Sequence, residues 1–307
     1  MLSVCDLKIM IPSPSYDDVS RIFNAVQSTK KGKSKRPFRE WDWSDVVPED
    51  PEEAYVIGKK IGEGCSSTVY KATHPLHRKE VAVKVVKEQY APYVKQEVDF
   101  LAKMQPYPNF PRLYDTWTNK DGCFCIAMEC VDATLEDVIL GDTDITLSND
   151  DRYFIIEELA EAIKACHDQH IVHFDIKAAN IGLTLDGRVM LLDFGLAENF
   201  KTVQSPSFQK GIADGYILKV SKEHRPIEAF LCNHPLTEKA DVWAFAVVAY
   251  DIFTGLNLFD VDEFCETGQA ELPDNLSKEV PADIEDLIQQ CTQANPSDRP
   301  NIEKWCA

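Results

Sequence analysis

The sequence has few positive charges for its length. Its 307 residues include 51 acidic side chains and only 32 basic ones, which gives a formal net charge of −19. A chain with this excess of negative charge is poorly suited to general binding of nucleic acid or of anionic membrane surfaces. We therefore expect no direct nucleic-acid partner and no membrane partner.

Long apolar runs are also missing. The longest, VWAFAVVAY at residues 242–250, is far too short to span a bilayer. The opening residues, MLSVCDLKIM, have no cationic stretch followed by an apolar one, so they do not resemble a secretory signal. These absences predict an intracellular protein, cytoplasmic or nuclear, without a transmembrane helix.

The ten cysteines form no paired framework, which favours free thiols in a reducing compartment. Cys123 and Cys125 share one face of a predicted strand, but no second pair lies at the spacing of zinc ligands. We interpret them as buried apolar thiols.

Residues 1–53 differ in composition from the rest and are predicted to form an N-terminal extension. Residues 15–27 combine a capping-box pattern with one apolar helical face, formed by Tyr16, Val19, Ile22, Phe23 and Val26. This helix either packs on the main domain or docks on a partner. Six basic residues at 30–39 indicate a nuclear-import or anion-binding segment, or a solvated linker, and the acidic stretch 41–53 indicates a tether.

From residue 54 the chain predicts two lobes of different composition. Short segments rich in Val, Ile and Tyr predict strands, one amphipathic helix is expected at about 91–104, and two more strands at 113–118 and 123–129. Beyond about residue 132 the pattern is mainly helical. The fold class is thus α+β, with a small β-rich lobe at about 54–130 and a larger helical lobe at about 131–307. A cleft between such lobes is where a ligand would bind.

The order of several polar residues matches the requirements of phosphoryl transfer from a nucleotide. That reaction needs backbone amides around the phosphates, a cation, carboxylates for magnesium and a further carboxylate for the attacking hydroxyl. Gly62 and Gly64 lie in a predicted strand turn, and a strand places Lys84 thirteen residues before Glu97. Further on, the segments HFDIKAAN and LLDFG contribute Asp175, Lys177, Asn180 and Asp193.

Together these segments resemble the signature motifs of the eukaryotic protein kinase family, specifically serine/threonine kinases. The resemblance covers about residues 54–306. It continues in HRPIEAFL, in the apolar segment DVWAFAVVAYDIFTG and in DRP, where Arg299 would pair with Glu228. Ser221 stands where such kinases keep a Ser or Thr that touches the catalytic residues.

The resemblance implies a role for each matching residue, with ATP and Mg²⁺ as cofactors and a protein carrying a Ser or Thr acceptor as substrate. Lys84, positioned by Glu97, would contact the α- and β-phosphates, and Asn180 and Asp193 would bind magnesium. Asp175 would accept the hydroxyl proton, and Lys177 would stabilise the transferring group. The nucleotide site would be completed by Gly62, Gly64, Val69, Ala82, Glu129, Val131 and Leu183, with Met128 at the back of the adenine pocket.

Four positions depart from the family pattern. Ser67 replaces the third glycine of the phosphate loop, Pro226-Ile227-Glu228 replaces Ala-Pro-Glu, and Ala246 replaces a helix glycine. The fourth is Phe174, where the family usually has an Arg that receives a phosphate on the activation loop. Because Phe cannot do this, we hypothesise that Thr202, Ser205 and Ser207 are incidental hydroxyls on a loop. Catalysis would then not require their phosphorylation.

Three other functions are compatible with parts of this sequence. A pseudokinase would keep the fold as a scaffold or allosteric partner, but it has no physical need for the complete polar set. A kinase-fold enzyme with a small-molecule acceptor is disfavoured by Ser221 and by the Glu228–Arg299 pair. Finally, the N-terminal extension is interpretable as a docking or inhibitory module.

Overall fold

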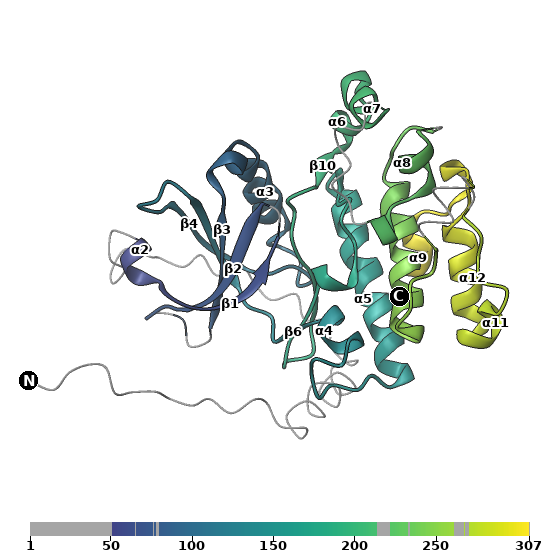
Figure 1. Ribbon diagram of the computed structural model, residues 1–307, viewed down its shortest axis with the longest axis horizontal. Coiled ribbons are helices and arrows are strands. Elements are labelled where there is room, and N and C mark those ends of the chain that lie inside the picture. Colours follow the sequence, from purple (N-terminus) through teal and green to yellow (C-terminus); the bar gives the residue numbers. More distant parts are fainter. Residues whose placement is uncertain are drawn as a thin grey trace, which may run out of the picture.

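The structure is a computed structural model that describes residues 51–64, 66–75, 77, 80–213, 222–232, 234–260, 267 and 270–306. The helix predicted at 15–27, the basic run 30–39 and Ser221 lie outside these residues. Two lobes lie side by side, a sheet with one long helix and a larger, mainly helical lobe (Figure 1). No described helix is long and apolar enough to cross a membrane.

The small lobe is an antiparallel sheet of strand order β1-β2-β3-β5-β4. Its strands are β1 (Val56–Glu63), β2 (Ser67–Thr73), β3 (Val81–Val86), β4 (Leu113–Thr118) and β5 (Phe124–Glu129). Helix α3 (Ala91–Met104) packs through Val94 on Val86 and Ile126 of this sheet. The predicted strands and the predicted helix at 91–104 are all present.

Of the acidic stretch 41–53, which was expected to be a tether, the structure describes only residues 51–53, and these lie beside the small lobe. Residues Pro51–Ala54 form the short helix α2, and the side chains of Ala54 and Tyr55 are buried against the sheet. The Tyr55 ring stacks on Trp117 with a centroid distance of 5.0 Å. This aromatic contact joins two parts of the small lobe that are far apart in the chain.

The large lobe is built around helix α9 (Lys239–Thr254), whose residues from Ala240 to Ile252 are all buried. Helix α5 (Asn149–Asp168) begins at a capping box of Ser148 and Asp151 and packs beside α9. The remaining described helices are α4 (Leu135–Ile139), α6 (Phe200–Val203), α7 (Pro206–Ala213), α8 (Ile227–Leu231), α11 (Leu276–Glu279) and α12 (Ala282–Cys291).

Two small sheets in the large lobe bound the segments that approach the small lobe. One has strand order β6-β8-β9, formed by β6 (Ala133–Thr134), β8 (Ile181–Leu183) and β9 (Val189–Leu191). The other pairs β7 (Ile171–Val172) with β10 (Glu198–Asn199). These short pairings place residues 173–180 and 192–197 next to each other, facing the small lobe.

Candidate active site

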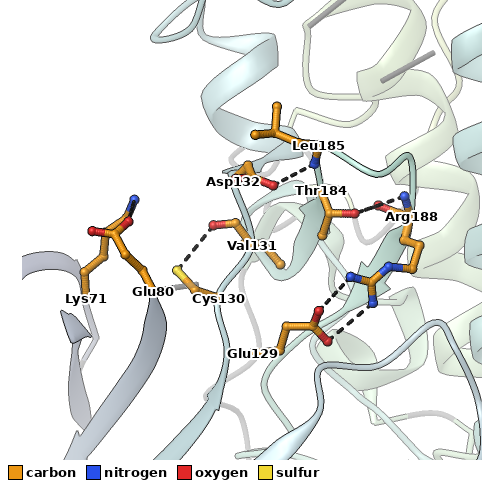
Figure 2. A pocket seen from close by; sticks show the side chains of 9 residues that line it. All are labelled: Lys71, Glu80, Glu129, Cys130, Val131, Asp132, Thr184, Leu185 and Arg188. Carbon is orange, nitrogen blue, oxygen red and sulfur yellow. Dashed lines mark hydrogen bonds and ion pairs between the residues drawn. The ribbon is translucent and has the colours of Figure 1, made fainter. Parts of the chain in front are cut away.

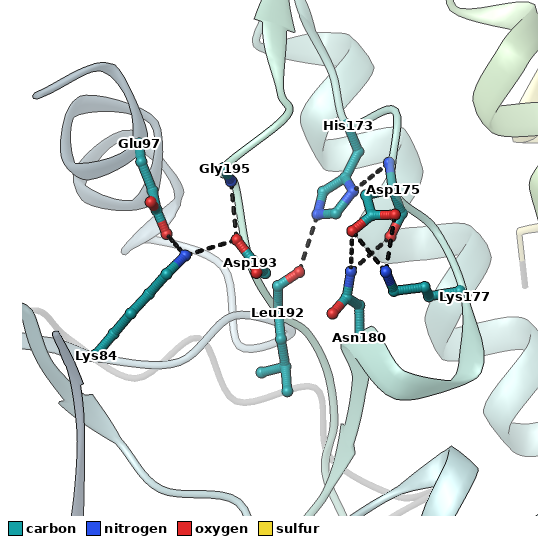
Figure 3. A network of polar contacts seen from close by, with 9 residues as sticks. All are labelled: Lys84, Glu97, His173, Asp175, Lys177, Asn180, Leu192, Asp193 and Gly195. Atoms are coloured by element: carbon teal, nitrogen blue, oxygen red, sulfur yellow. Dashed lines mark hydrogen bonds and ion pairs between the residues drawn. The ribbon is translucent and has the colours of Figure 1, made fainter. Parts of the chain in front are cut away.

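A buried lysine links the two lobes. Lys84 on β3 donates to the carboxylate of Glu97 on α3, and its Nζ also lies 2.8 Å from Oδ1 of Asp193 (Figure 3). Lys84 and Glu97 are only 5% and 8% exposed. The structure therefore brings together three of the residues predicted to form the site.

Charge pairing favours the charged forms of Lys84 and Asp193. Burial alone would lower the pKa of Lys84, but the carboxylates of Asp193 and Glu97 raise it above its ordinary value. Burial alone would raise the pKa of Asp193, but Lys84 and the Gly195 amide bring it to about 2. Both side chains are thus charged at neutral pH, as a phosphate-binding cation and a metal-binding carboxylate must be.

The catalytic-loop residues surround the carboxylate of Asp175. Lys177 Nζ lies 3.1 Å from Oδ1 and 2.9 Å from Oδ2 of Asp175. The Asn180 amide donates to Oδ2 and to the backbone carbonyl of Asp175, both at 2.8 Å. Asp175 and Asn180 are each 8% exposed, so these bonds hold the loop in one shape.

Asp241 on α9 holds the backbone of the catalytic loop just before Asp175. Its two carboxylate oxygens accept from the backbone amides of His173 and Phe174 at 2.8 and 2.9 Å. The His173 ring in turn lies 3.0 Å from the carbonyl of Leu192, next to Asp193. Burial lowers the pKa of His173, which favours its neutral ring. The sequence placed Asp241 in a helix but did not indicate that it supports the loop.

Phe194 connects the site to the core of both lobes. Its buried ring lies 6.5 Å from Phe100, 5.8 Å from Phe110 and 5.2 Å from His173, measured between centroids. The preceding Asp193 has a left-handed φ of 62°, and its Oδ1 accepts from the Gly195 amide at 2.9 Å. A Cβ at Gly195 would lie 2.9 Å from that oxygen, so a larger residue there would displace the Asp193 carboxylate.

The residues predicted to hold the nucleotide lie in the sheet of the small lobe and its β1–β2 hairpin, in the connection after β5, and in β8. Gly62 lies over Val69, and the Gly64 amide donates to the Ser67 carbonyl at 2.8 Å to close the hairpin. Ala82 and Leu183, predicted to enclose the adenine, are both buried. In the connection after β5, Val131 packs on Gly182, where a Cβ would lie 2.4 Å from the valine side chain. The sequence did not single out Gly182.

A sequence model of the protein kinase domain matches residues 55–307. The chain belongs to the protein kinase family. Its two lobes, a β-sheet lobe and a mainly helical lobe, are those of a protein kinase fold.

Similar proteins are kinases from several eukaryotes. Serine/threonine-protein kinase dst1 of Dictyostelium discoideum is 27% identical over 88% of this chain and 37% of its own length. Sperm motility kinase 3A of Mus musculus is 29% identical over 90% of this chain and 52% of its length. For Aurora kinase C of Mus musculus the values are 27%, 80% and 87%. The chain thus spans about half or less of the first two relatives.

The residues present fit the magnesium that protein kinases generally use. Leu192 donates to the Asn180 carbonyl at 2.8 Å, so Asn180 and the residue before Asp193 lie on adjacent segments. Among the described residues no group of three or more His, Cys, Asp or Glu side chains is placed to hold a metal. Mg²⁺ is commonly bound by one or two protein side chains together with nucleotide phosphates and water, which suits this pair.

The cysteines of this kinase are free wherever the structure describes them. Cys125 is buried and Cys123 half-buried, and burial raises the pKa of the Cys125 thiol to about 11. The prediction of buried thiols is confirmed for Cys125, whereas Cys123 is half-buried.

Proposed function

We propose that this chain is an active serine/threonine kinase that transfers the γ-phosphoryl group of ATP to hydroxyls of protein substrates. The observation that carries the proposal is the simultaneous contact of Lys84 with Glu97 and Asp193. This contact joins β3, α3 and the start of the activation segment in one arrangement. A scaffold would have no need to bury the charged pair of Lys84 and Glu97, because each charge costs free energy to desolvate.

Each polar residue has a part in this reaction. Lys84 would neutralise phosphate charge, and Asn180 and Asp193 would hold Mg²⁺, which supplies further stabilisation of the developing negative charge. The substrate hydroxyl would attack the γ-phosphorus while the bond to ADP breaks, and its proton would go to Asp175. Lys177, 2.9 Å from Asp175, would stabilise the transferring group. A lysine at this position resembles serine/threonine rather than tyrosine kinases.

Phosphate transfer from Mg-ATP to a generic serine peptide tests the proposal. We expect transfer by the wild type and a loss of about 10²–10⁴-fold in Asp175→Asn, because asparagine cannot accept the proton. Equal unfolding temperatures of the two proteins would show that the loss is chemical. Absence of transfer by a folded wild type would favour a pseudokinase instead.

The surroundings of Phe174 support activity without phosphorylation of the activation segment. Phe174 is 8% exposed, and its ring stacks on Phe208 of α7 at a centroid distance of 6.0 Å. We call the buried apolar group around it the Phe174 cluster, which comprises Val172, Phe174, Val203, Phe208, Ala229, Leu236 and Ala240. In this cluster, apolar contact joins the catalytic loop to α6 and α7. The arginine that the family usually has at position 174 would instead need a phosphate on the activation segment to make such a connection.

The three hydroxyls named above are not on an irregular loop. Thr202 lies in α6 and Ser207 in α7, and Ser205 precedes α7. Ser205 Oγ donates to the Thr202 carbonyl at 2.6 Å and accepts from the Phe208 amide at 3.2 Å. The expectation of a loop is therefore wrong for Thr202 and Ser207, and the Ser205 hydroxyl caps α7. That none of the three hydroxyls is needed as a phosphorylation site stays a prediction.

We expect Thr202→Ala/Ser207→Ala to keep kcat within about twofold of wild type, since the Phe174 cluster remains intact. Adding Ser205→Ala should lower the free energy of unfolding by about 1 kcal/mol through loss of the cap, without lowering kcat well below the unfolding temperature. Steady-state kinetics and thermal unfolding measure both effects. Phosphatase treatment of the wild type should also leave kcat unchanged. A collapse of turnover in a folded variant, or after phosphatase treatment, contradicts the proposal.

A further inference from the structure

An ion pair ties the small lobe to the large lobe at the connection between them. Glu129 is the last residue of β5 and pairs with Val81 in the sheet of the small lobe. Its carboxylate accepts two hydrogen bonds from Arg188, at 2.6 Å from Nη2 and 3.3 Å from Nη1 (Figure 2). Arg188 belongs to the turn between β8 and β9 of the large lobe, 59 residues further along the chain.

The turn that carries Arg188 is itself held in place. Thr184 and Arg188 exchange backbone and side-chain hydrogen bonds, among them Arg188 N to Thr184 Oγ1 at 3.0 Å. Asp186 accepts from Arg188 Nε at 3.1 Å and from Nη2 at 3.2 Å. The guanidinium therefore has carboxylates on two sides. Burial alone would lower the pKa of Arg188, but these hydrogen bonds raise it.

The other end of the connection is bound to the same turn through its backbone. Asp132 N donates to the Leu183 carbonyl at 2.9 Å, and Asp132 Oδ2 accepts from Leu185 N at 2.6 Å. With Glu129 bound to Arg188, residues 129–132 are fixed at both ends to the β8–β9 hairpin. The same residues line a cavity of about 220 Å³ on this part of the molecule, together with Lys71 and Glu80.

We infer that Arg188 is a positioning residue of the nucleotide site, because it fixes Glu129 and thereby the backbone of residues 129–131 against the large lobe. This inference rests on the proposed function and on the expectation, from the family resemblance, that Glu129 and Val131 help to complete the nucleotide site. A guanidinium holds a carboxylate in a defined plane through two bonds, whereas an ammonium acts as a point charge. Preorganising the connection lowers the cost of ordering it when ATP binds.

The exposed fractions of the two side chains set the scale of the effect. They are 31% exposed for Arg188 and 19% for Glu129, so solvent partly screens the pair. We expect Arg188→Gln to raise both the KM and the Kd for Mg-ATP by about fivefold. The values of kcat and of the KM for peptide should stay near wild type, because Arg188 lies in the turn between β8 and β9 and not in the loop that carries Asp175.

Four variants test the inference by steady-state kinetics and by calorimetric titration with Mg-ATP. Arg188→Lys should recover part of the affinity for ATP, and Glu129→Gln should match Arg188→Gln. The double variant should be no weaker than either single one, since both remove the same interaction. Arg112→Gln is the control for charge beside Glu129, because Arg112 is exposed, its carbonyl accepts from the Glu129 amide at 2.8 Å, and the net charge changes equally.

The outcomes separate this inference from the proposed function. Unchanged ATP affinity in a folded Arg188→Gln protein overturns the inference alone. An equal loss of ATP affinity in Arg112→Gln also overturns the inference alone. So does a fall in the kcat of Arg188→Gln without a change in its KM for ATP. Failure of the wild type to bind Mg-ATP overturns the proposed function and the inference with it. If Arg188→Gln does not fold, the same comparison is made with Glu129→Gln and Arg188→Lys.

Discussion

Replacing Asp193 with asparagine is expected to lower kcat by about 10³-fold or more, because the site loses the charge that would hold magnesium. Its carboxylate has a pKa of about 2 and is fully ionised at neutral pH. Asparagine has nearly the same size, and its amide oxygen can still accept from Lys84 and Gly195. The substitution therefore removes a charge from the site and leaves its packing in place.

The measurement is phosphate transfer at increasing magnesium concentration, with thermal unfolding as the test of folding. Asp193→Asn should require more magnesium for half-maximal rate than the wild type and should not reach the wild-type rate at saturation. Asp99→Asn is a suitable control, because Asp99 is an exposed aspartate on α3 and the same atoms are exchanged. A folded Asp193→Asn protein with wild-type turnover would rule out the assigned role of Asp193.

The second large effect concerns stability. The pair of Arg299 and Glu228 is fully buried, with side chains 0% exposed and bonds of 2.8 and 2.6 Å. Arg299 also donates to the carbonyls of Gln293 and Lys239 and stacks over Trp243 at 4.8 Å. We expect Glu228→Gln to lower the free energy of unfolding by about 3–5 kcal/mol, because it leaves a buried guanidinium without a counter-charge. The unfolding temperature should fall by roughly 10 °C.

An exposed pair of similar length is the control for this prediction. Lys60 and Glu63 lie 2.7 Å apart, but their side chains are 54% and 56% exposed. We expect Glu63→Gln to leave the unfolding temperature unchanged, since solvent screens the pair. Thermal unfolding followed by circular dichroism measures both variants. Equal unfolding temperatures for Glu228→Gln and wild type would show that burial does not set the value of this pair.

Much of the fold followed from local sequence pattern. The alternation of Val and Ala up to Lys84 and the helical stripe of residues 91–104 matched β3 and α3, because both patterns report which side chains face the core. The spacing of Asp175, Lys177 and Asn180 is short enough for one loop to bring all three together. The pattern did not indicate the short helix at Pro51–Ala54 or the stack of Tyr55 on the distant Trp117.

The sequence by itself determined the family and the two lobes, and it predicted which polar residues form the site. Only the tertiary structure decided which residues support that site. Asp241 under the catalytic loop, Arg188 beside Glu129 and Phe208 against Phe174 are separated from their partners by 67, 59 and 34 residues. Contacts over such separations depend on how strands and helices pack. The type of a residue does not indicate which distant residue it will contact.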